Sequence, residues 1–334
     1  MKAVWYCENG KAEEVLQYGE LPTPVPGSGE VLVRLMTSGV NPSDVRSRQI
    51  RPLNAPRIIP HSDGAGIIVA VGQGVDTARI GQRVWIWNGQ WERPFGTACE
   101  FIAVPEHQAV ELPEHISFAQ GACLGIPLIT AIEAIRQAGD LRGETLLVTG
   151  AASSVGHYVS QLALRAGARV IGTIGSTERA ASARMAGVTE LIDYKTESIT
   201  ERVRSLTGGQ GVDAIIDLDF SSVVPLLTDG TLKQHGTAVC YGSNVQGDVA
   251  LPIRAVFFNS ITLKFFVAYN LTPTDRAFGL HRLSQLLQDT TLIHQIGAEF
   301  PLQDTCKAHQ AVETGKVVGN VVIHTVDAPA MSNN

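Results

Sequence analysis

The residues with the clearest chemical pattern lie in the range Thr145–Arg179. A short apolar run, Leu146–Val148, predicts a strand buried on both faces. The apolar spacing over Val155–Ala166 predicts a helix, and Arg169–Ile174 predicts a second buried strand. Strand, tight turn, helix and strand form a βαβ unit, and the N-terminus of its helix attracts phosphate groups. This segment therefore predicts a nucleotide-binding site.

The turn of this unit departs from the usual dinucleotide pattern, which needs small residues at three spaced positions. Gly150 and Gly156 fit the outer two positions, whereas Ser153, followed by Ser154, stands at the middle one. A serine adds a hydroxymethyl group where the backbone is usually bare, but its hydroxyl can also bond a phosphate. An ordinary strand–helix turn is the alternative, and the βαβ context favours nucleotide binding. The predicted cofactor turn comprises Gly150, Ala151, Ala152, Ser153, Ser154, Val155 and Gly156.

The end of the second strand indicates which nucleotide binds. NAD-binding units usually carry an acidic residue there for the adenosine ribose hydroxyls. This chain has Ile174, Gly175 and Ser176 instead, so no carboxylate would repel a 2′-phosphate. Arg179 follows in the next turn, with a charge and geometry suited to phosphate. A solvated helix residue is the alternative for Arg179, but the missing acid and the added base together favour NADPH.

The composition narrows the class of protein. The 334 residues are enough for two domains, and 44% hydrophobic with 17% charged residues is typical of a globular chain. A net charge of −6 argues against a general nucleic-acid or anionic-membrane surface. We expect no signal peptide and no membrane span. The five cysteines are dispersed, which suggests reduced thiols in a cytoplasmic protein.

The order of the expected elements predicts two domains. Short strands separated by Pro/Gly clusters are expected at Lys2–Tyr6, Val31–Ser38, Gly66–Val71, Arg83–Trp87 and Thr97–Val104. Strands then alternate with helices, which predicts a doubly wound parallel sheet. A helix at Asp275–Gln288 and a β-rich tail follow. We therefore expect a barrel-like β-rich domain, residues 1–125 and 270–334, interrupted by a nucleotide domain, residues 126–269.

Several spaced blocks resemble one family. The blocks are GEVLVRLMTSGVNPSD, PHSDGAGIIVAVG, GQRVW, GTACEFIAVP, QGACLGIPLITAIEAI, GETLLVTGAASSVG, GVDAIID and FPLQDTCKAHQAVETG. In order and spacing the chain resembles the medium-chain dehydrogenase/reductase superfamily, and within it the zinc-free NADPH:quinone oxidoreductases of the zeta-crystallin type. The resemblance implies a GroES-like catalytic domain with an inserted Rossmann domain of α/β class.

The zinc-binding relatives show which residues would be needed to bind zinc, and these can be looked for in this chain. They carry Cys where this chain has Asn41, and His where it has Ser62. Neither an Asn amide nor a Ser hydroxyl is a usual zinc ligand, and the four-cysteine lobe of those relatives is missing. His61 stands beside the lost position, and a single His is more often a hydrogen-bonded core residue than a metal site. We expect neither catalytic nor structural zinc.

The resemblance also implies the substrate side of the site, in a cleft between the two domains. Asn41 would direct its amide into that cleft, and a turn residue before Pro42 is the alternative. Thr130 matches a position where relatives set a hydroxyl against the nicotinamide, and a Thr bonded to its own helix is the alternative. Arg46 stands where relatives often carry a Tyr that faces the quinone. A cation there would favour anionic substrates, unless Arg46 points into solvent.

The remaining cofactor contacts are implied in the same way. Ser176, Arg179 and Tyr194 match the positions around the 2′-phosphate. Gly242, Ser243 and Asn244 match the strand-end loop beside the nicotinamide ribose. Phe266, Val267 and Ala268 match the segment that pairs with the carboxamide. The expected function is hydride transfer from NADPH to a quinone. Reduction of an α,β-unsaturated carbonyl compound is the first alternative, and a non-enzymatic nucleotide-binding role is the second.

The resemblance finally implies a homodimer. The run Ile261–Tyr269, ITLKFFVAY, is expected to be the last strand of the nucleotide-binding sheet. An apolar edge strand is a liability unless it is paired or covered. In the resembled family the corresponding edges pair across a two-fold axis. A helix or loop of the same chain covering the edge is the alternative.

Overall fold

The computed structural model describes residues 1–326. The chain divides into two compact units, which we call unit 1 (residues 1–126 and the segment from His294 onward) and unit 2 (Pro127–Ile293). The fold class expected from the sequence, a GroES-like domain with an inserted parallel-sheet domain, is confirmed. The expected second boundary, at residue 270, lies before helix α10 (Pro273–Leu287), which contacts α4 (Ile129–Ala138). The compact unit therefore continues to Ile293.

Unit 1 is organised around one long strand, β3 (Glu30–Val40), which pairs with β15, β4 and β6. The sheet order is β14-β15-β3-β4-β5-β7, and all of its pairings except β14–β15 are antiparallel. The bounds of the other strands are β14 (Ile296–Pro301), β15 (Asn320–His324), β4 (Asp63–Val71), β5 (Arg83–Ile86), β6 (Phe101–Pro105) and β7 (Ala109–Glu111). A separate two-stranded sheet joins β1 (Lys2–Trp5) to β2 (Gln17–Glu20).

The helices of unit 1 are short, and α2 is among those that the sequence did not predict. They are α1 (Ala12–Val15), α2 (Pro42–Ile50), α3 (Phe118–Gly121) and α11 (Thr305–Glu313). The buried residues of α2 are Asp44, Val45 and Arg48, so its inward face is mostly polar and shows no apolar stripe. The strand expected over Thr97–Val104 begins only at Phe101. Thr97 instead donates a hydrogen bond from its hydroxyl to the Asp63 carbonyl, at 2.6 Å.

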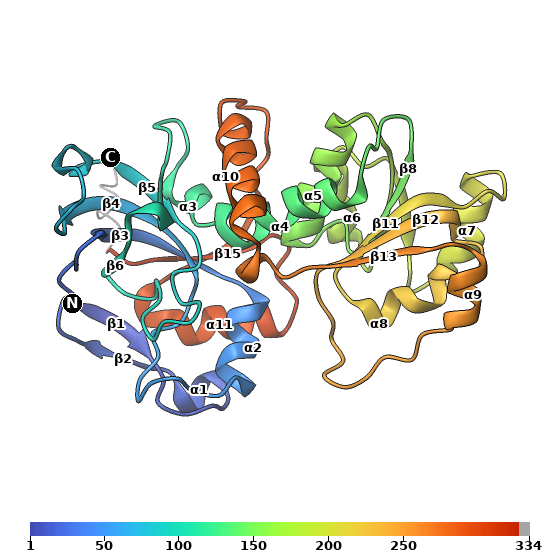
Figure 1. Cartoon of the computed structure of the whole chain (residues 1–334). Helices are drawn as coiled ribbons and strands as arrows, with labels where there is room; N and C mark the ends of the chain where they lie inside the picture. Colours follow the sequence, from blue (N-terminus) through green and yellow to red (C-terminus); the bar gives the residue numbers. More distant parts are fainter. Residues whose placement is uncertain (327–334) are drawn as a thin grey trace, which may run out of the picture. The chain divides into compact units, whose positions relative to one another are not determined.

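Unit 2 contains a six-stranded parallel sheet in the order β10-β9-β8-β11-β12-β13 (Figure 1). Counted from β8, this is the 3-2-1-4-5-6 order of a dinucleotide-binding fold. The strands are β8 (Thr145–Val148), β9 (Arg169–Ile174), β10 (Glu190–Asp193), β11 (Val212–Asp217), β12 (Leu232–Cys240) and β13 (Thr262–Phe265). From β8 the chain adds strands first on one side, β9 and β10, and then on the other, β11 to β13. The order of the strands therefore reverses between β8 and β11, which is where such folds bind ligands.

The helices of unit 2 follow the expected alternation. Besides α4 and α10, they are α5 (Ser154–Arg165), α6 (Thr177–Met185), α7 (Ile199–Leu206), α8 (Phe220–Val223) and α9 (Ile253–Phe258). One face of the sheet is covered by α7, α8 and α9, because Val203, Val223 and Val256 share a core cluster with Leu147 and Ile215. Helix α8 is short and is followed directly by a 3-10 turn, Val224–Leu227, that contains Pro225.

Strand β13 lies at one edge of the sheet, which confirms the expected edge position of this apolar run. Phe265 on β13 is 56% exposed and Phe257 on α9 is 75% exposed. Pairing of two such edges in a homodimer stays a prediction. Light scattering would test it, since a mass near one chain of 35.7 kDa would contradict the dimer.

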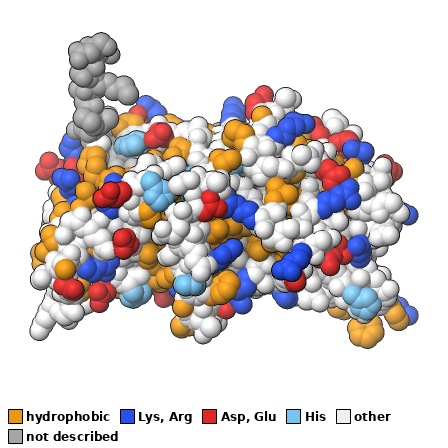
Figure 2. Space-filling view, turned by 90° about the horizontal axis from the view of Figure 1, so that it is seen from above, with side chains coloured by type: hydrophobic (Ala, Val, Ile, Leu, Met, Phe, Trp, Pro, Cys, Tyr) orange, Lys and Arg blue, Asp and Glu red, His pale blue; other side chains and the backbone are white. Residues whose placement is uncertain are grey.

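The described surface carries charges of both signs. On the face that Figure 2 shows, the Lys and Arg side chains of the described residues are interspersed with Asp and Glu and do not gather into one basic patch. In the part of the chain that the structure describes, no helix combines the length and the apolar character needed to cross a membrane.

Candidate functional site

The carboxyl edge of the parallel sheet brings together most of the predicted cofactor residues. Parallel strands end at the same edge, so the segments that follow β8, β9, β12 and β13 are neighbours there. These segments carry the predicted Gly150–Gly156 turn, the Ser176–Arg179 segment, the Gly242–Asn244 loop and the Phe266–Ala268 segment. Each of these predicted groups therefore lies at the strand ends of unit 2.

The cofactor turn has the backbone geometry that its sequence suggested. Gly150 has φ +62°, and a side chain there would meet Leu218 at 2.7 Å. A Cβ on Gly156 would meet the Gly150 carbonyl oxygen at 2.2 Å, so helix α5 packs against the turn only because Gly156 is bare. The Gly150 N–H donates to the Thr173 hydroxyl of β9 at 2.9 Å. The turn is thus fixed between two strands, with the N-terminus of α5 directly behind it.

Ser153 caps helix α5. Its hydroxyl oxygen accepts a hydrogen bond from the Gly156 N–H at 3.0 Å. Burial raises the pKa of Tyr241, which follows β12, and the Ser153 hydroxyl opposes that shift. A capping serine at the middle position of the turn therefore engages one N–H group that a phosphate would otherwise receive. Tyr241 was not predicted. Its position one residue beyond the end of β12 was the only signal for it.

The end of β9 places the predicted 2′-phosphate residues close together. Ser176 caps α6, and its hydroxyl oxygen accepts the Arg179 N–H at 3.3 Å. A Cβ on Gly175 would meet the Tyr194 hydroxyl oxygen at 2.6 Å, which shows that the Tyr194 ring lies against this strand end. Tyr194 is 52% exposed, and Arg179 is partly buried. The side chains here offer hydroxyl and guanidinium donors, and Ile174 is an apolar residue buried at the end of the strand.

Asp217 and Asp219 lie at the C-terminal end of β11. Together with Thr149 and Asn244 they form a group that we call the Asp219 cluster. Asp217 accepts the Thr149 hydroxyl at 2.6 Å and also the Asp219 N–H. Asp219 accepts the Asn244 N–H at 2.9 Å and the Asn244 side-chain amide at 2.8 Å. Asp219 therefore fastens the predicted Gly242–Asn244 loop to the end of β11.

The two acids of the Asp219 cluster titrate in opposite directions. Burial raises the pKa of Asp217 to about 6, against the opposing effect of the Thr149 hydroxyl. Burial also acts to raise the pKa of Asp219, but hydrogen bonds from Asn244 and Ser221 outweigh it and hold this pKa below its ordinary value. Neither residue was predicted from the sequence, although an acid at the end of a buried strand was a usable signal.

The last predicted cofactor segment and Thr130 also lie in unit 2. The Phe266 N–H donates to the Cys240 carbonyl at 3.3 Å, and its ring lies 6.3 Å from that of Tyr241. The Ala268 carbonyl accepts a hydrogen bond from Arg276 of α10, whereas Val267 is 46% exposed. Thr130 is buried in the first turn of α4, with 4% of its surface exposed.

In unit 1, Asn41 belongs to a buried group that we call the Asn41 cluster (Asn41, Asp44, Asp63). Its side-chain amide donates to Asp63 at 2.8 Å, and its main-chain N–H donates to Asp44 at 2.8 Å, closing the N-terminus of α2. Asp63 also accepts the Ile126 N–H at 2.9 Å. Burial raises the pKa of Asp44 to about 7, although donors from Asn41 and Ser62 oppose the shift. Asn41 itself is 5% exposed, so its amide is largely committed to holding carboxyl groups.

Arg46 and Arg48 of α2 have different surroundings. Arg46, the residue predicted to select substrates, is exposed on the helix, and its role stays a prediction. Arg48 is fully buried and forms an ion pair with Glu313 of α11. The sequence offered no signal for this pair, because its members are 265 residues apart.

His61 lies in a second buried polar group of unit 1. Its Nδ1 is 2.9 Å from the Ser38 hydroxyl, and its Nε2 is 2.8 Å from Nε2 of His309. Burial lowers the pKa of His61 to about 3, so the ring is neutral near pH 7. Among residues 1–326 no three or more His, Cys, Asp or Glu side chains are grouped to hold a metal ion. Zinc independence stays a prediction, which metal analysis of the purified protein would test.

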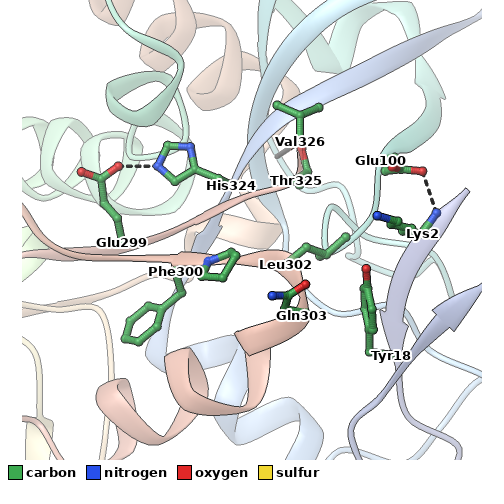
Figure 3. A pocket seen from close by; sticks show the side chains of 11 residues that line it. Lys2, Tyr18, Glu100, Glu299, Phe300, Leu302, Gln303, His324, Thr325 and Val326 are labelled. Atoms are coloured by element: carbon green, nitrogen blue, oxygen red, sulfur yellow. Dashed lines mark hydrogen bonds and ion pairs between the residues drawn. The ribbon is translucent and has the colours of Figure 1, made fainter. Parts of the chain in front are cut away.

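Unit 1 also contains a cavity of about 390 Å³ between β1, β14 and β15 (Figure 3). Its carboxylates already have partners in the chain. Glu299 pairs with the His324 imidazole, and Glu100 accepts the Lys2 main-chain N–H at 2.6 Å. Both carboxylates of this cavity are therefore already hydrogen-bonded within the protein.

Comparisons with known proteins agree with this arrangement. Residues 27–114 match the "Alcohol dehydrogenase GroES-like domain" family and residues 154–284 match the "Zinc-binding dehydrogenase" family. A quinone oxidoreductase of Pseudomonas aeruginosa is 30% identical over 316 residues, covering 93% of this chain and 95% of that protein. A 2-haloacrylate reductase of Burkholderia sp. is 27% identical, covering 97% of this chain and 98% of its own length.

A solved structure shows the same fold over the whole length. A mycobacterial protein complexed with NADPH superposes with a TM-score of 0.86 at 27% identity, covering 97% of this chain and 100% of that one. Similarity of this extent covers both units.

Proposed function

Because the chain belongs to the quinone oxidoreductase family of the medium-chain dehydrogenase/reductase superfamily, we propose that it transfers a hydride from NADPH to a quinone without zinc. The observation that carries this proposal is the end of β9. A buried Ile174 stands where NAD-binding units place an acid, and Ser176, Arg179 and Tyr194 gather beside it. The NADPH complex of the mycobacterial relative supports the choice of cofactor.

The residues of unit 2 fit this cofactor. Gly150 makes the turn and Gly156 lets α5 pack closely against it, so the N-terminus of α5, which favours an anion, lies at the strand end. Arg179 and Ser176 would hold the 2′-phosphate through charge-assisted and hydroxyl hydrogen bonds. Asp219 would position the Gly242–Asn244 loop for the nicotinamide ribose, because it binds that loop through both the main chain and the side chain of Asn244.

The cofactor supplies the hydride, so the protein has to orient the reactants and place hydrogen-bond donors. We propose that Thr130 faces the nicotinamide and that Asn41 donates to the developing oxyanion of the substrate. For Asn41 this role requires that one amide hydrogen remain available beside Asp63, to which it donates in the structure. The proton would then come from water.

The first alternative is reduction of an activated double bond by the same fold and cofactor. The similarity to a 2-haloacrylate reductase over nearly the full length favours this candidate specifically. The two functions differ in the acceptor that receives the hydride, and the residues proposed to hold NADPH serve both.

NADPH oxidation with two panels of acceptors distinguishes these functions. We expect turnover with small quinones and little with enones or 2-haloacrylates, and the reverse result would select the alternative. Turnover with neither panel, together with retained NADPH binding, would favour a non-enzymatic role. Zinc bound in stoichiometric amount and required for turnover would contradict the zinc-free reaction.

Arg179→Ala tests the cofactor assignment. A charged hydrogen bond contributes roughly 1.5–3 kcal/mol, so NADPH binding should weaken about tenfold or more. NADH lacks the 2′-phosphate, and its dissociation constant should stay unchanged. Arg184, on the last turn of the same helix, provides a matched control as Arg184→Ala. Equal weakening of both cofactors would show that Arg179 does not hold the phosphate.

A further inference from the structure

A second cavity of unit 1 is lined by an arginine, Arg51, that pairs with no carboxylate of the described chain. It has a volume of about 320 Å³ and lies between the chain that follows α2 and the loop near Gln90. The polar groups on its wall include Tyr6, Arg51 and Asn54, and its apolar wall includes Leu53 and Ile58. Small-molecule sites combine an apolar wall with a few polar groups in this way, and this volume lies at the lower end of their range.

Arg51 is the cation of this cavity. Its guanidinium group stacks on the Trp91 ring, with 4.3 Å between its central carbon and the ring centroid. Within the described residues, no hydrogen bond or ion pair engages the guanidinium group. Its main chain is fixed, because the Arg51 N–H donates to Ser47 at the end of α2 and its carbonyl accepts the Asn9 side-chain amide at 3.0 Å. The stacking holds the plane of the guanidinium in place and leaves its N–H groups available.

Tyr6 supplies a second donor on the wall of the cavity. Its main chain pairs with Ile58 in both directions at 2.9 Å, and the side chain is only 3% exposed. Its hydroxyl has no hydrogen-bond partner in the described chain, and the oxygen is not sealed inside the protein. The hydroxyl is therefore open to the cavity that the ring lines. Burial raises the pKa of Tyr6 to about 12, which keeps the hydroxyl protonated as a donor near pH 7.

A guanidinium and a phenolic hydroxyl beside an apolar wall match one ligand chemistry. A carboxylate accepts hydrogen bonds from both donors and neutralises the cation, while a short apolar body fits against Leu53 and Ile58. We propose that this cavity binds a small organic carboxylate, held by Arg51 and Tyr6. The site belongs to unit 1 alone, so the proposal does not depend on hydride transfer or on NADPH.

The two cavities of unit 1 differ in whether their charged side chains already have partners in the chain. In the cavity of Figure 3 both Glu299 and Glu100 have partners in the chain. In the Arg51 cavity the single lining acid, Glu92, is exposed and lies outside ion-pair distance of Arg51. Glu92 should therefore weaken an anionic ligand without occupying its site, and this supplies a test that leaves the binding residues intact.

Binding of benzoate to the full chain, without cofactor, tests the proposal. Benzoate should bind saturably in calorimetric titration, and neutral benzamide should bind about tenfold more weakly or worse, because it lacks the charge. Arg51→Met keeps the stem that packs on Trp91 and should weaken benzoate binding about tenfold or more. Tyr6→Phe should weaken it several-fold.

Two further variants keep the test decisive. Arg57 stacks on Trp5 at 5.1 Å and does not line the cavity, so Arg57→Met is the matched control and should leave benzoate binding unchanged. Glu92→Gln, on an exposed side chain, should strengthen benzoate binding even if Arg51→Met fails to fold. Absence of saturable benzoate binding, equal binding of benzamide, equal losses in the two arginine variants, or no gain in Glu92→Gln would overturn the proposal.

Discussion

The Asn41 cluster of unit 1 and the Asp219 cluster of unit 2 each hold two carboxyl groups, and they do so in different settings. In the Asn41 cluster, Asp44 and Asp63 are 3% and 0% exposed, and the nearest donors are N–H groups of the chain itself. In the Asp219 cluster, Asp217 is equally buried, but Asp219 is 9% exposed and receives donors on both oxygens.

The difference shows what determines the charge of a buried acid. Desolvation favours the neutral form, and hydrogen bonds to the carboxylate favour the charged form. Asp44 has donors but no water, so desolvation wins and its pKa rises to about 7. Asp219 keeps some water contact and several donors, so its pKa falls below the ordinary value. The first cluster is an internal support of unit 1, whereas the second fastens a loop at the strand ends of unit 2.

The largest effect is expected from Asp63→Ala. The variant removes the carboxylate that accepts hydrogen bonds from the Asn41 amide and the Ile126 N–H. Loss of these buried charged hydrogen bonds should lower the free energy of unfolding by about 2–5 kcal/mol. Urea unfolding measures this loss, and Asp219→Ala is the comparison. The donors of Asn244 that bind Asp219 can reach water in that variant, so the loss in free energy of unfolding should be smaller. Equal losses in the two variants would contradict the difference in burial between the two clusters.

The pH dependence of stability should separate the two acids that have raised pKa values. A folded pKa of about 7 for Asp44 lies above the ordinary value of 3.8, so the folded state keeps a proton that the unfolded state releases between these pH values. Stability should therefore fall as pH rises from about 4 to about 7, by at most about 1.4 kcal/mol per pH unit for this group. Asp217 should act in the same direction but only up to about pH 6.

Variants assign this slope to a residue. Asp44→Asn should flatten the fall between about pH 6 and 7, while Asp217→Asn should leave that interval unchanged and flatten only the lower part. Urea unfolding at half-unit pH steps would measure both slopes. An unchanged slope in Asp44→Asn would show that this carboxyl is charged in the folded protein.

The smallest effect is expected at the Gly156 N–H, a neutral donor that the Ser153 hydroxyl caps at the strand ends of unit 2. Ser153→Gly removes the acceptor of the Gly156 N–H and frees this group for a phosphate. NADPH binding should tighten about threefold to tenfold, with little loss of stability, since glycine is itself an acceptable cap. Fluorescence titration of NADPH measures the change. Unchanged or weaker binding in Ser153→Gly would mean that the serine assists the phosphate.

Local features of the chain were predictable from the sequence. The cofactor turn, α5 and the two strands around it follow from apolar spacing and from two glycines within a short segment, because their interactions are between near neighbours. The same holds for the position of β13 at the sheet edge.

Interactions between distant parts of the chain were not predictable. The Asn41 cluster joins residues 22 positions apart, and His61 meets His309 across 248 positions. Helix α2 gave no apolar pattern, because it buries Asp44 and Arg48 against partners that other elements supply. The burial of a polar residue can be predicted only when its partner is known, and a single sequence does not identify that partner.

The pairing of β3 with β15 has a consequence for how the chain is made. Unit 1 takes strands from both ends of the chain, whereas unit 2 is one continuous segment, Pro127–Ile293. During synthesis, unit 2 can fold as soon as Ile293 has left the ribosome, but β3 keeps an unpaired side until β15 emerges. A nascent chain halted before Asn320 would therefore expose the edge of β3 along Thr37–Val40, where its unpaired N–H and C=O groups could pair with another extended chain.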